Sequence, residues 1–453
     1  MRVYRGHLIH ISGAADLDGA RAHLVSIPDG ALTVDHAGAI GYSGEFSELP
    51  VEAAGAPVVD CRPAFLLPGF IDTHIHFPQT HCVDSYGGGQ LLDWLQRCIF
   101  PAEAMLADPA YARGVARDFC NRRIAVGTTT ALVFGSAFPH AQDALFEESV
   151  RAGLRTISGR GIQTVGPEAA GPLLTDDETA IALTRAEIDK WHAAGDGLIQ
   201  IAVVPRFALS VTGRTLYNLG ELYHAVRGDG VYFHTHLSEN LGEIAYVRAT
   251  YGVEHYLDTY DGRFAGGADG LSMLGRRSVM AHAVHCSDHE LHRMAETGTS
   301  IAHCPTSQLF LGSGTMPWRR TTACGVNVAL GTDVSAGDEW LIPRVLNDCF
   351  KVHISEPEGA ALSVPPADLL FTATLAGARA LDIADRVGNL DVGKDADFLV
   401  IDPQRQPLLP ELLARIDRGD ADRLLFTLLM GMREDAVDQV YVRGRRLRPV
   451  SPA

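Results

Sequence analysis

Eight apolar runs, each followed by a longer stretch of helical character, most strongly constrain what this 453-residue chain can fold into. Short apolar runs bounded by turn residues are typical of buried strands, and their alternation with stretches rich in Ala, Leu and Arg indicates a parallel sheet. The runs lie at 69–76, 127–134, 154–163, 198–207, 231–239, 278–285, 299–307 and 326–334. Eight such units predict an α/β fold of the (β/α)8 TIM-barrel type, with a doubly wound sheet as the alternative.

The two ends of the chain lack the alternation of strand-like and helix-like stretches. Residues 1–67 alternate short apolar runs with Gly, Asp and Pro turns, and residues 386–453 return to short strands. We therefore predict a small β-sandwich domain built from 1–67 and 386–453, and a catalytic barrel over 68–385.

The net charge and the spacing of the cysteines bear on which ligands the protein binds and in which compartment it works. The formal net charge of −17 opposes a role in nucleic-acid binding, which needs clustered Lys and Arg against phosphates. Eight cysteines without any Cys-X-X-Cys pair indicate reduced thiols in a cytoplasmic protein. The first ten residues lack a signal-peptide pattern, and the apolar runs are shorter than a membrane span.

Histidines and carboxylates stand at the ends of the predicted strands. His74 and His76 are two apart at the end of the first strand, so the strand's alternation points both imidazoles to the same side. His236 ends the fifth strand and Glu239 follows in the loop, while His234 lies deeper on the same face and is interpreted as a core or supporting histidine. Strand ends at the carboxyl face of a barrel carry its catalytic residues.

Two later strands complete the set. His282 closes the sixth strand and is the candidate there, whereas His285 follows in the loop. Asp333 ends the eighth strand after Gly and Thr, which allow close packing. Each of these residues alone could be a buried polar group satisfied by hydrogen bonds, but their convergence on one face of a barrel favours a site.

The combination of three histidines and one aspartate suits Zn2+, or iron, with one position left for water. A metal there lowers the pKa of that water toward neutrality, Glu239 is placed for general acid/base work, and His282 can hold a developing oxyanion. Barrel hydrolases with two metals use a carbamylated lysine on the fourth strand. The only lysines are Lys190, Lys351 and Lys394, none on a predicted barrel strand, which predicts a single metal.

Several segments in order resemble the amidohydrolase superfamily, and within it the guanine deaminases: PGFIDTHIHFPQ, GQLLDWL, GTTTALVFG, PRFALS, HTHLSEN, AHCPTSQLFLGSG and GTDVSAG. The resemblance covers nearly the whole chain. By position it implies His74, His76, His236 and Asp333 as metal ligands, with Asp333 also steering the hydroxide. It further implies Glu239 as proton shuttle, His282 beside the metal, and hydrolysis of guanine to xanthine and ammonia by a homodimer.

The resemblance also implies that Gln79, Arg206 and Phe207 contact the purine. A side-chain amide can match O6 and N1 of guanine, and an arginine fork can serve O6 or N7. Phe207 either packs on the ring or belongs to the core, and Leu91 and Trp94 are expected to wall the pocket. Departures at 163–176, 338–350 and Gln308 leave a pterin, 8-oxoguanine or a triazine open as substrate, and a non-catalytic binding barrel is the rival of another class.

Overall fold

The computed structural model describes residues 1–14, 16–83, 85, 91–268, 270–356, 364–417 and 419–451. The chain divides into two compact units. The first comprises Met1–Asp72, Asn121–Thr130 and Trp340–Pro449, and the second comprises Thr73–Cys120, Ala131–Glu339 and the chain end from Val450.

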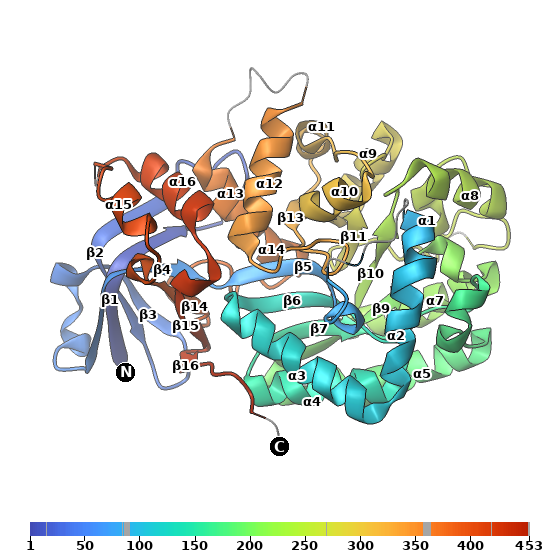
Figure 1. Ribbon diagram of the computed structural model, residues 1–453, viewed down its shortest axis with the longest axis horizontal. Coiled ribbons are helices and arrows are strands. Elements are labelled where there is room, and N and C mark those ends of the chain that lie inside the picture. The colour runs from blue at the N-terminus through green and yellow to red at the C-terminus, as the bar shows by residue number, and fades with distance from the viewer. Residues whose placement is uncertain are drawn as a thin grey trace. The chain divides into compact units, whose positions relative to one another are not determined.

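Figure 1 shows a parallel sheet in the order β13-β12-β11-β10-β9-β7-β6-β5. His74, His76, His236 and His282 lie on its strands. Its strands are β5 (Phe70–His76), β6 (Thr128–Phe134), β7 (Arg155–Gly159), β9 (Ile199–Pro205), β10 (Tyr232–Leu237), β11 (Ser278–His282), β12 (Ser300–His303) and β13 (Val328–Leu330), with the short β8 (Gly161–Ile162) paired to β9. The pairings from β7 through β13 are parallel. All eight predicted runs contain a strand, which confirms the TIM-like fold.

The strands are buried on both faces. A parallel sheet covered by helices has such strands, which explains why their sequences are continuous apolar runs. Backbone hydrogen bonds tie the segment after β13 back to β5: the N–H of Asp333 donates to the carbonyl of His74 at 2.8 Å, and the N–H of His76 donates to that of Val334 at 3.0 Å. The eighth strand is shorter than predicted. Asp333 has φ +53°, in the left-handed region that a continuing strand cannot use, so it lies in the loop beyond Leu330.

Helices follow the strands of the second unit, and α4, α5 and α7 pack on β9 (Figure 1). Two of these helices begin at residues that are typical helix caps. Asp176 caps α5 by accepting from the N–H of Thr179, and Ser287 with Glu290 forms a capping box at the start of α9. The helices are α1 (Leu91–Trp94), α2 (Phe100–Ala104), α3 (Pro109–Ala125), α4 (Pro139–Ala152), α5 (Asp177–Trp191), α6 (Ala194–Gly197), α7 (Gly213–Val226), α8 (Leu241–Tyr251), α9 (Asp288–Thr297), α10 (Pro305–Leu311) and α11 (Trp318–Ala323). A π-helical turn, η4 (Leu95–Ile99), joins α1 to α2.

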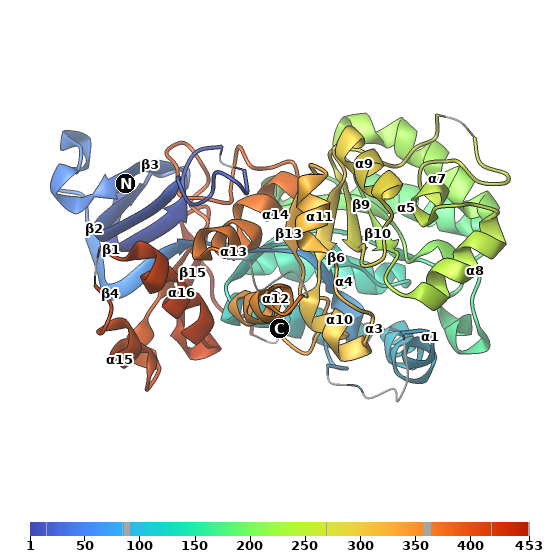
Figure 2. The ribbon, with the colours of Figure 1, turned by 90° about the horizontal axis from the view of Figure 1, so that it is seen from above.

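The first unit contains a mixed seven-stranded sheet in the order β16-β15-β14-β4-β1-β2-β3, with β1, β2, β3 and β4 side by side in Figure 2. Its strands are β1 (Arg2–Ile11), β2 (Leu24–Val34), β3 (Ile40–Glu45), β4 (Val58–Pro68), β14 (Phe398–Ile401), β15 (Val437–Val442) and β16 (Arg445–Arg446). The helices α12 (Ile342–Ile354), α13 (Pro366–Ala373), α14 (Leu375–Ala380), α15 (Leu409–Leu413) and α16 (Ala421–Gly431) complete it.

Both ends of the chain therefore contribute to one small β structure, as predicted, although its strands form a single hydrogen-bonded sheet where a sandwich was expected. Both faces of the sheet are covered by apolar residues: Tyr4 belongs to one buried cluster and its neighbour Val3 to another. The limits at residues 67/68 and 385/386 stay a prediction. Over the described ranges, none of the helices has the length and apolar character needed to cross a membrane.

Candidate metal and catalytic site

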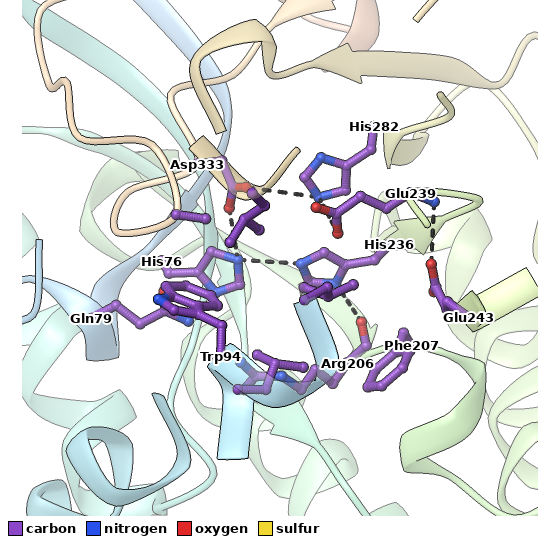
Figure 3. A pocket seen from close by; sticks show the side chains of 14 residues that line it. His76, Gln79, Trp94, Arg206, Phe207, His236, Glu239, Glu243, His282 and Asp333 are labelled. Carbon is purple, nitrogen blue, oxygen red and sulfur yellow. Dashed lines mark hydrogen bonds and ion pairs between the residues drawn. The ribbon is translucent and has the colours of Figure 1, made fainter. Parts of the chain in front are cut away.

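Four of the predicted residues meet at the carboxyl ends of the strands. His74 and His76 come from β5, His236 from β10 and Asp333 from the loop after β13, and their candidate ligand atoms all lie within 4.8 Å of one another. Asp333 Oδ1 is 3.1 Å from Nε2 of His74 and 3.2 Å from Nε2 of His76, and the Nε2 atoms of His76 and His236 are 3.3 Å apart. In Figure 3, the side chains of His76, His236 and Asp333 point toward one another. This is a His/His/His/Asp metal-binding group of the kind found in zinc amidohydrolases.

A glycine makes room for this arrangement. A Cβ added at Gly331 would come within 2.9 Å of both Cys304 Sγ and His74 Cβ. Only a residue without a side chain lets the segment after β13 approach β5 so closely. The predicted role of the glycine before Asp333 in close packing is therefore confirmed.

The hydrogen bonds behind the histidines determine which ring nitrogen faces the group. Nδ1 of His236 lies 2.5 Å from the carbonyl oxygen of Arg206, which can only accept, so Nδ1 carries the hydrogen. Burial, together with His74, His76 and His282, lowers the pKa of His236 well below its usual value, so the ring is neutral. Its Nε2 therefore presents a lone pair to the group.

His234 determines the tautomer of His74 in the same way. Its Nδ1 is 2.8 Å from the carbonyl oxygen of Val279 and its Nε2 is 2.8 Å from Nδ1 of His74. Burial first, and then His74, lowers the pKa of His234 well below its usual value, so His234 is neutral and donates to Val279. Its Nε2 must accept from Nδ1 of His74, which leaves Nε2 of His74 as the ligand atom. The interpretation of His234 as a supporting histidine agrees with this geometry.

This relay makes a prediction for metal affinity. His234→Phe removes the acceptor for Nδ1 of His74, and loss of such a supporting hydrogen bond lowers metal affinity about ten- to hundredfold. Competition with a chromophoric chelator measures the change. His292→Phe, at an exposed position on α9, is the matched control and should bind metal like the wild type. An unchanged affinity in His234→Phe would refute the relay.

The electrostatics of the group favour a cation. Burial lowers the pKa of His76 to about 4. Burial raises the pKa of Asp333, but the neighbouring histidines, His74 foremost, outweigh it and hold this pKa well below its usual value. Neutral imidazole nitrogens beside a buried carboxylate are the donor set that a borderline-soft divalent ion prefers, so the residues present fit a zinc-like metal.

Glu239 and His282 lie beside this group. His282 Nε2 is 3.5 Å from Glu239 Oε2 and 3.8 Å from Asp333 Oδ2 (Figure 3). Burial, followed by repulsion from Asp333 and Glu243, raises the pKa of Glu239 well above its usual value, while burial lowers that of His282 to about 3. His282 has φ +72° and Ser238 φ +48°, and residues held in this strained region are concentrated at functional sites.

Two residues that support Glu239 were not predicted. Glu243 on α8 accepts from the backbone N–H groups of Glu239 and Asn240 at 3.2 and 3.3 Å, and the hydroxyl of Tyr256 donates to it at 2.7 Å. Ser313 donates to Glu239 Oε1 at 3.2 Å. The spacing Asn240-X-X-Glu243 is a capping-box signature and was available in the sequence. Ser313 has no comparable signal.

All of the predicted substrate residues line one cavity together with the predicted catalytic residues Glu239, His282 and Asp333. The cavity contains about 400 Å³ of space between protein atoms, including the part open to solvent. Its walls include the five predicted residues Gln79, Leu91, Trp94, Arg206 and Phe207, together with Leu95, Leu311 and Ala336, which sequence reasoning missed. Phe207 both lines the cavity and packs in an apolar cluster, and its contact with the purine ring stays a prediction.

A model of the amidohydrolase family matches residues 65–447. The chain belongs to the amidohydrolase family. A protein of Deinococcus radiodurans named probable guanine deaminase is 41% identical, and the guanine deaminase of Escherichia coli is 34% identical; each match covers 98% of this chain, and 98% and 97% of the relatives. A solved guanine deaminase of C. acetobutylicum with guanine bound in its active site superimposes with a TM-score of 0.86, at 26% identity, over 99% of this chain and all of that one.

Proposed function

We propose that this protein is a guanine deaminase, which converts guanine and water to xanthine and ammonia. The observation that carries the proposal is that His76, His236 and Asp333 of the His/His/His/Asp group line a single cavity together with Glu239 and the polar side chains Gln79 and Arg206. Relatives of the same length named guanine deaminase support the choice of ring.

His74, His76, His236 and Asp333 would hold the metal, which we propose to be one Zn2+ per chain, with iron compatible with the same donors. When bound, the metal supplies a water whose pKa is lowered toward neutrality. Nδ1 of His236 donates to the carbonyl of Arg206 and Nδ1 of His74 donates to His234, so Nε2 of each ring is directed at the site and metal binding needs no change of tautomer.

Glu239 is the proton shuttle in this proposal. Its carboxylate takes one proton from the attacking water and delivers it to a ring nitrogen of guanine; it then takes the second proton from the oxygen added to carbon 2 and gives it to the amine, which leaves carbon 2 as ammonia. Burial raises the pKa of Glu239, which makes the carboxylate a stronger proton acceptor and stabilises the protonated form that it reaches between the two transfers. Asp333 orients the water as a hydrogen-bond acceptor. His282, neutral because burial lowers its pKa to about 3, donates to the oxygen that is added to carbon 2.

Gln79 and Arg206 recognise the polar edge of the ring, and Phe207 packs on its face. Leu91 and Trp94 close the cavity on the apolar side, with the indole N–H of Trp94 occupied by the carbonyl of Ser85 at 2.8 Å. Because the indole is anchored in this way, Trp94 supplies only its apolar surface to the ring.

An ultraviolet assay of guanine loss in the zinc-loaded protein tests this function. We expect conversion of guanine to xanthine with release of one ammonia per ring. The same assay with a pterin, 8-oxoguanine and an aminotriazine should give much lower kcat/KM values. A protein that binds metal but leaves guanine unchanged would overturn the proposal, and faster turnover of one of the other rings would replace guanine by that ring.

We further propose that the protein works in the cytoplasm as a homodimer. The eight cysteines all lie within the described residues and form no disulfide bond there, which suits a reducing compartment. The homodimer is supported by the family resemblance alone.

A further inference from the structure

A buried glutamate behind the cavity joins the two polar residues proposed to recognise the ring. Glu103 lies on α2 and is 4% exposed. Its Oε1 accepts from the amide nitrogen of Gln79 at 2.8 Å, and its Oε2 accepts from Nη1 of Arg206 at 2.7 Å. Gln79 and Arg206 line the cavity, and Glu103 contacts both from behind. Glu103 can therefore influence a ligand only through these two side chains.

Glu103 and Ser335 together determine which end of the Gln79 amide is available. A carboxylate can only accept, so the amide nitrogen of Gln79 must face it. The amide oxygen faces the other way and accepts from the backbone N–H and the hydroxyl of Ser335, both at 3.2 Å. Both lone pairs of that oxygen are used, whereas the nitrogen keeps a second hydrogen. Gln79 therefore presents a donor to the cavity.

Arg206 is held by two residues of the same helix face. Phe100 and Glu103 are three apart on α2, so they project together, and the Arg206 guanidinium lies 5.3 Å from the centre of the Phe100 ring. Within the described part of the chain, the guanidinium makes no hydrogen bond other than the one to Glu103. Its remaining N–H groups are donors as well, so Gln79 and Arg206 both offer donors and no acceptor.

We propose that Glu103 is a positioning residue that sets ring selection: by accepting from both Gln79 and Arg206 it holds these two donors in place, which favours a ring with an oxygen at carbon 6 over one with an amine there. This inference rests on the proposed function. Guanine carries the O6 acceptor, whereas 2,6-diaminopurine has the same amine at carbon 2 but an N–H donor at carbon 6. Donors facing a donor leave buried polar groups unpaired, which is how hydrogen-bonding sites reject analogues.

The test is the ratio of kcat/KM for guanine to that for 2,6-diaminopurine, measured on the same preparation so that the fraction of folded enzyme cancels. Glu103→Gln replaces one of the two accepting oxygens by an N–H donor, so Gln79 and Arg206 can no longer both donate to this side chain. We expect the ratio to fall about tenfold or more. If 2,6-diaminopurine is bound but not hydrolysed, its inhibition constant against guanine replaces its kcat/KM.

Asp93→Asn is the matched control, because it removes one negative charge from the exposed side of α1 and should leave the ratio unchanged. Glu103→Asp keeps the carboxylate but shortens its reach, so the ratio should shift in the same direction, and this variant decides the matter if Glu103→Gln does not fold. An unchanged ratio in the folded Glu103 variants would overturn the positioning role. A wild-type protein that leaves guanine intact would instead overturn the proposed function, and this inference with it.

Discussion

Glu239→Gln is expected to keep its metal and lose about 10²- to 10⁴-fold in kcat for guanine, the usual contribution of a positioned general acid/base. Glutamine has nearly the same shape and can still accept from Ser313, so the cavity should be preserved. It cannot take a proton from water or return one to the departing amine. Steady-state kinetics and metal analysis of the same preparation measure both parts of the expectation.

Two features make this variant decisive. Glu239 does not belong to the group of metal-ligand candidates, so loss of turnover with full metal content separates proton transfer from metal binding. Glu254→Gln, at an exposed position shortly after α8, makes the same chemical change away from the cavity and should behave like the wild type. Wild-type kcat in Glu239→Gln would show that another group moves the proton.

The barrel could be predicted because its strands are buried on both faces and therefore read as continuous apolar runs. The period-two alternation of β5 was enough to place His74 and His76 on one side, and the carboxyl-end rule brought His236 and His282 to the same face. The end of the eighth strand, at Leu330, could not be predicted from the sequence. Asp333 has a left-handed backbone stabilised by hydrogen bonds to β5, a contact between segments far apart in the chain.

The supporting residues show where local patterns stop being informative. Glu103 contacts Gln79 and Arg206, from which it is separated by 24 and 103 positions, and nothing in the local sequence of α2 indicates those partners. Glu243 differs, because its role at the start of α8 follows from a spacing rule that operates within one helical turn. Sequence therefore reveals functional residues whose positions are set by one element, and misses those set by tertiary contacts.

The metal-ligand candidates and the substrate residues also differ in how far local sequence patterns identify them. His74, His76, His236 and Asp333 could be proposed from residue type and strand position, whereas Gln79 and Arg206 came from the family resemblance. The structure supplies a physical link between these two, since one buried carboxylate accepts from both side chains.

Removal of the metal is the second change expected to have a large effect. After exhaustive chelation and dialysis, guanine hydrolysis should fall to background, because Asp333 and the neutral His76 cannot by themselves lower the pKa of water toward neutrality. Adding Zn2+ should restore activity in proportion to the metal bound, reaching a plateau at one ion per chain. Because the metal binds only the folded state, free metal at about 100 times its Kd should also raise the free energy of unfolding by about 2.7 kcal/mol.

A pair of histidine variants links this loss to the proposed ligands. His76→Ala removes one member of the His/His/His/Asp group and should abolish both stoichiometric metal binding and turnover. His81→Ala removes an imidazole five positions later, on an exposed side chain paired with Asp118, and should retain both. Full activity in protein that measurably lacks metal would exclude a metal-dependent reaction. Retention of one tightly bound ion in His76→Ala would show that other residues hold the metal. The role of Glu239 would still be decided by the Glu239→Gln variant.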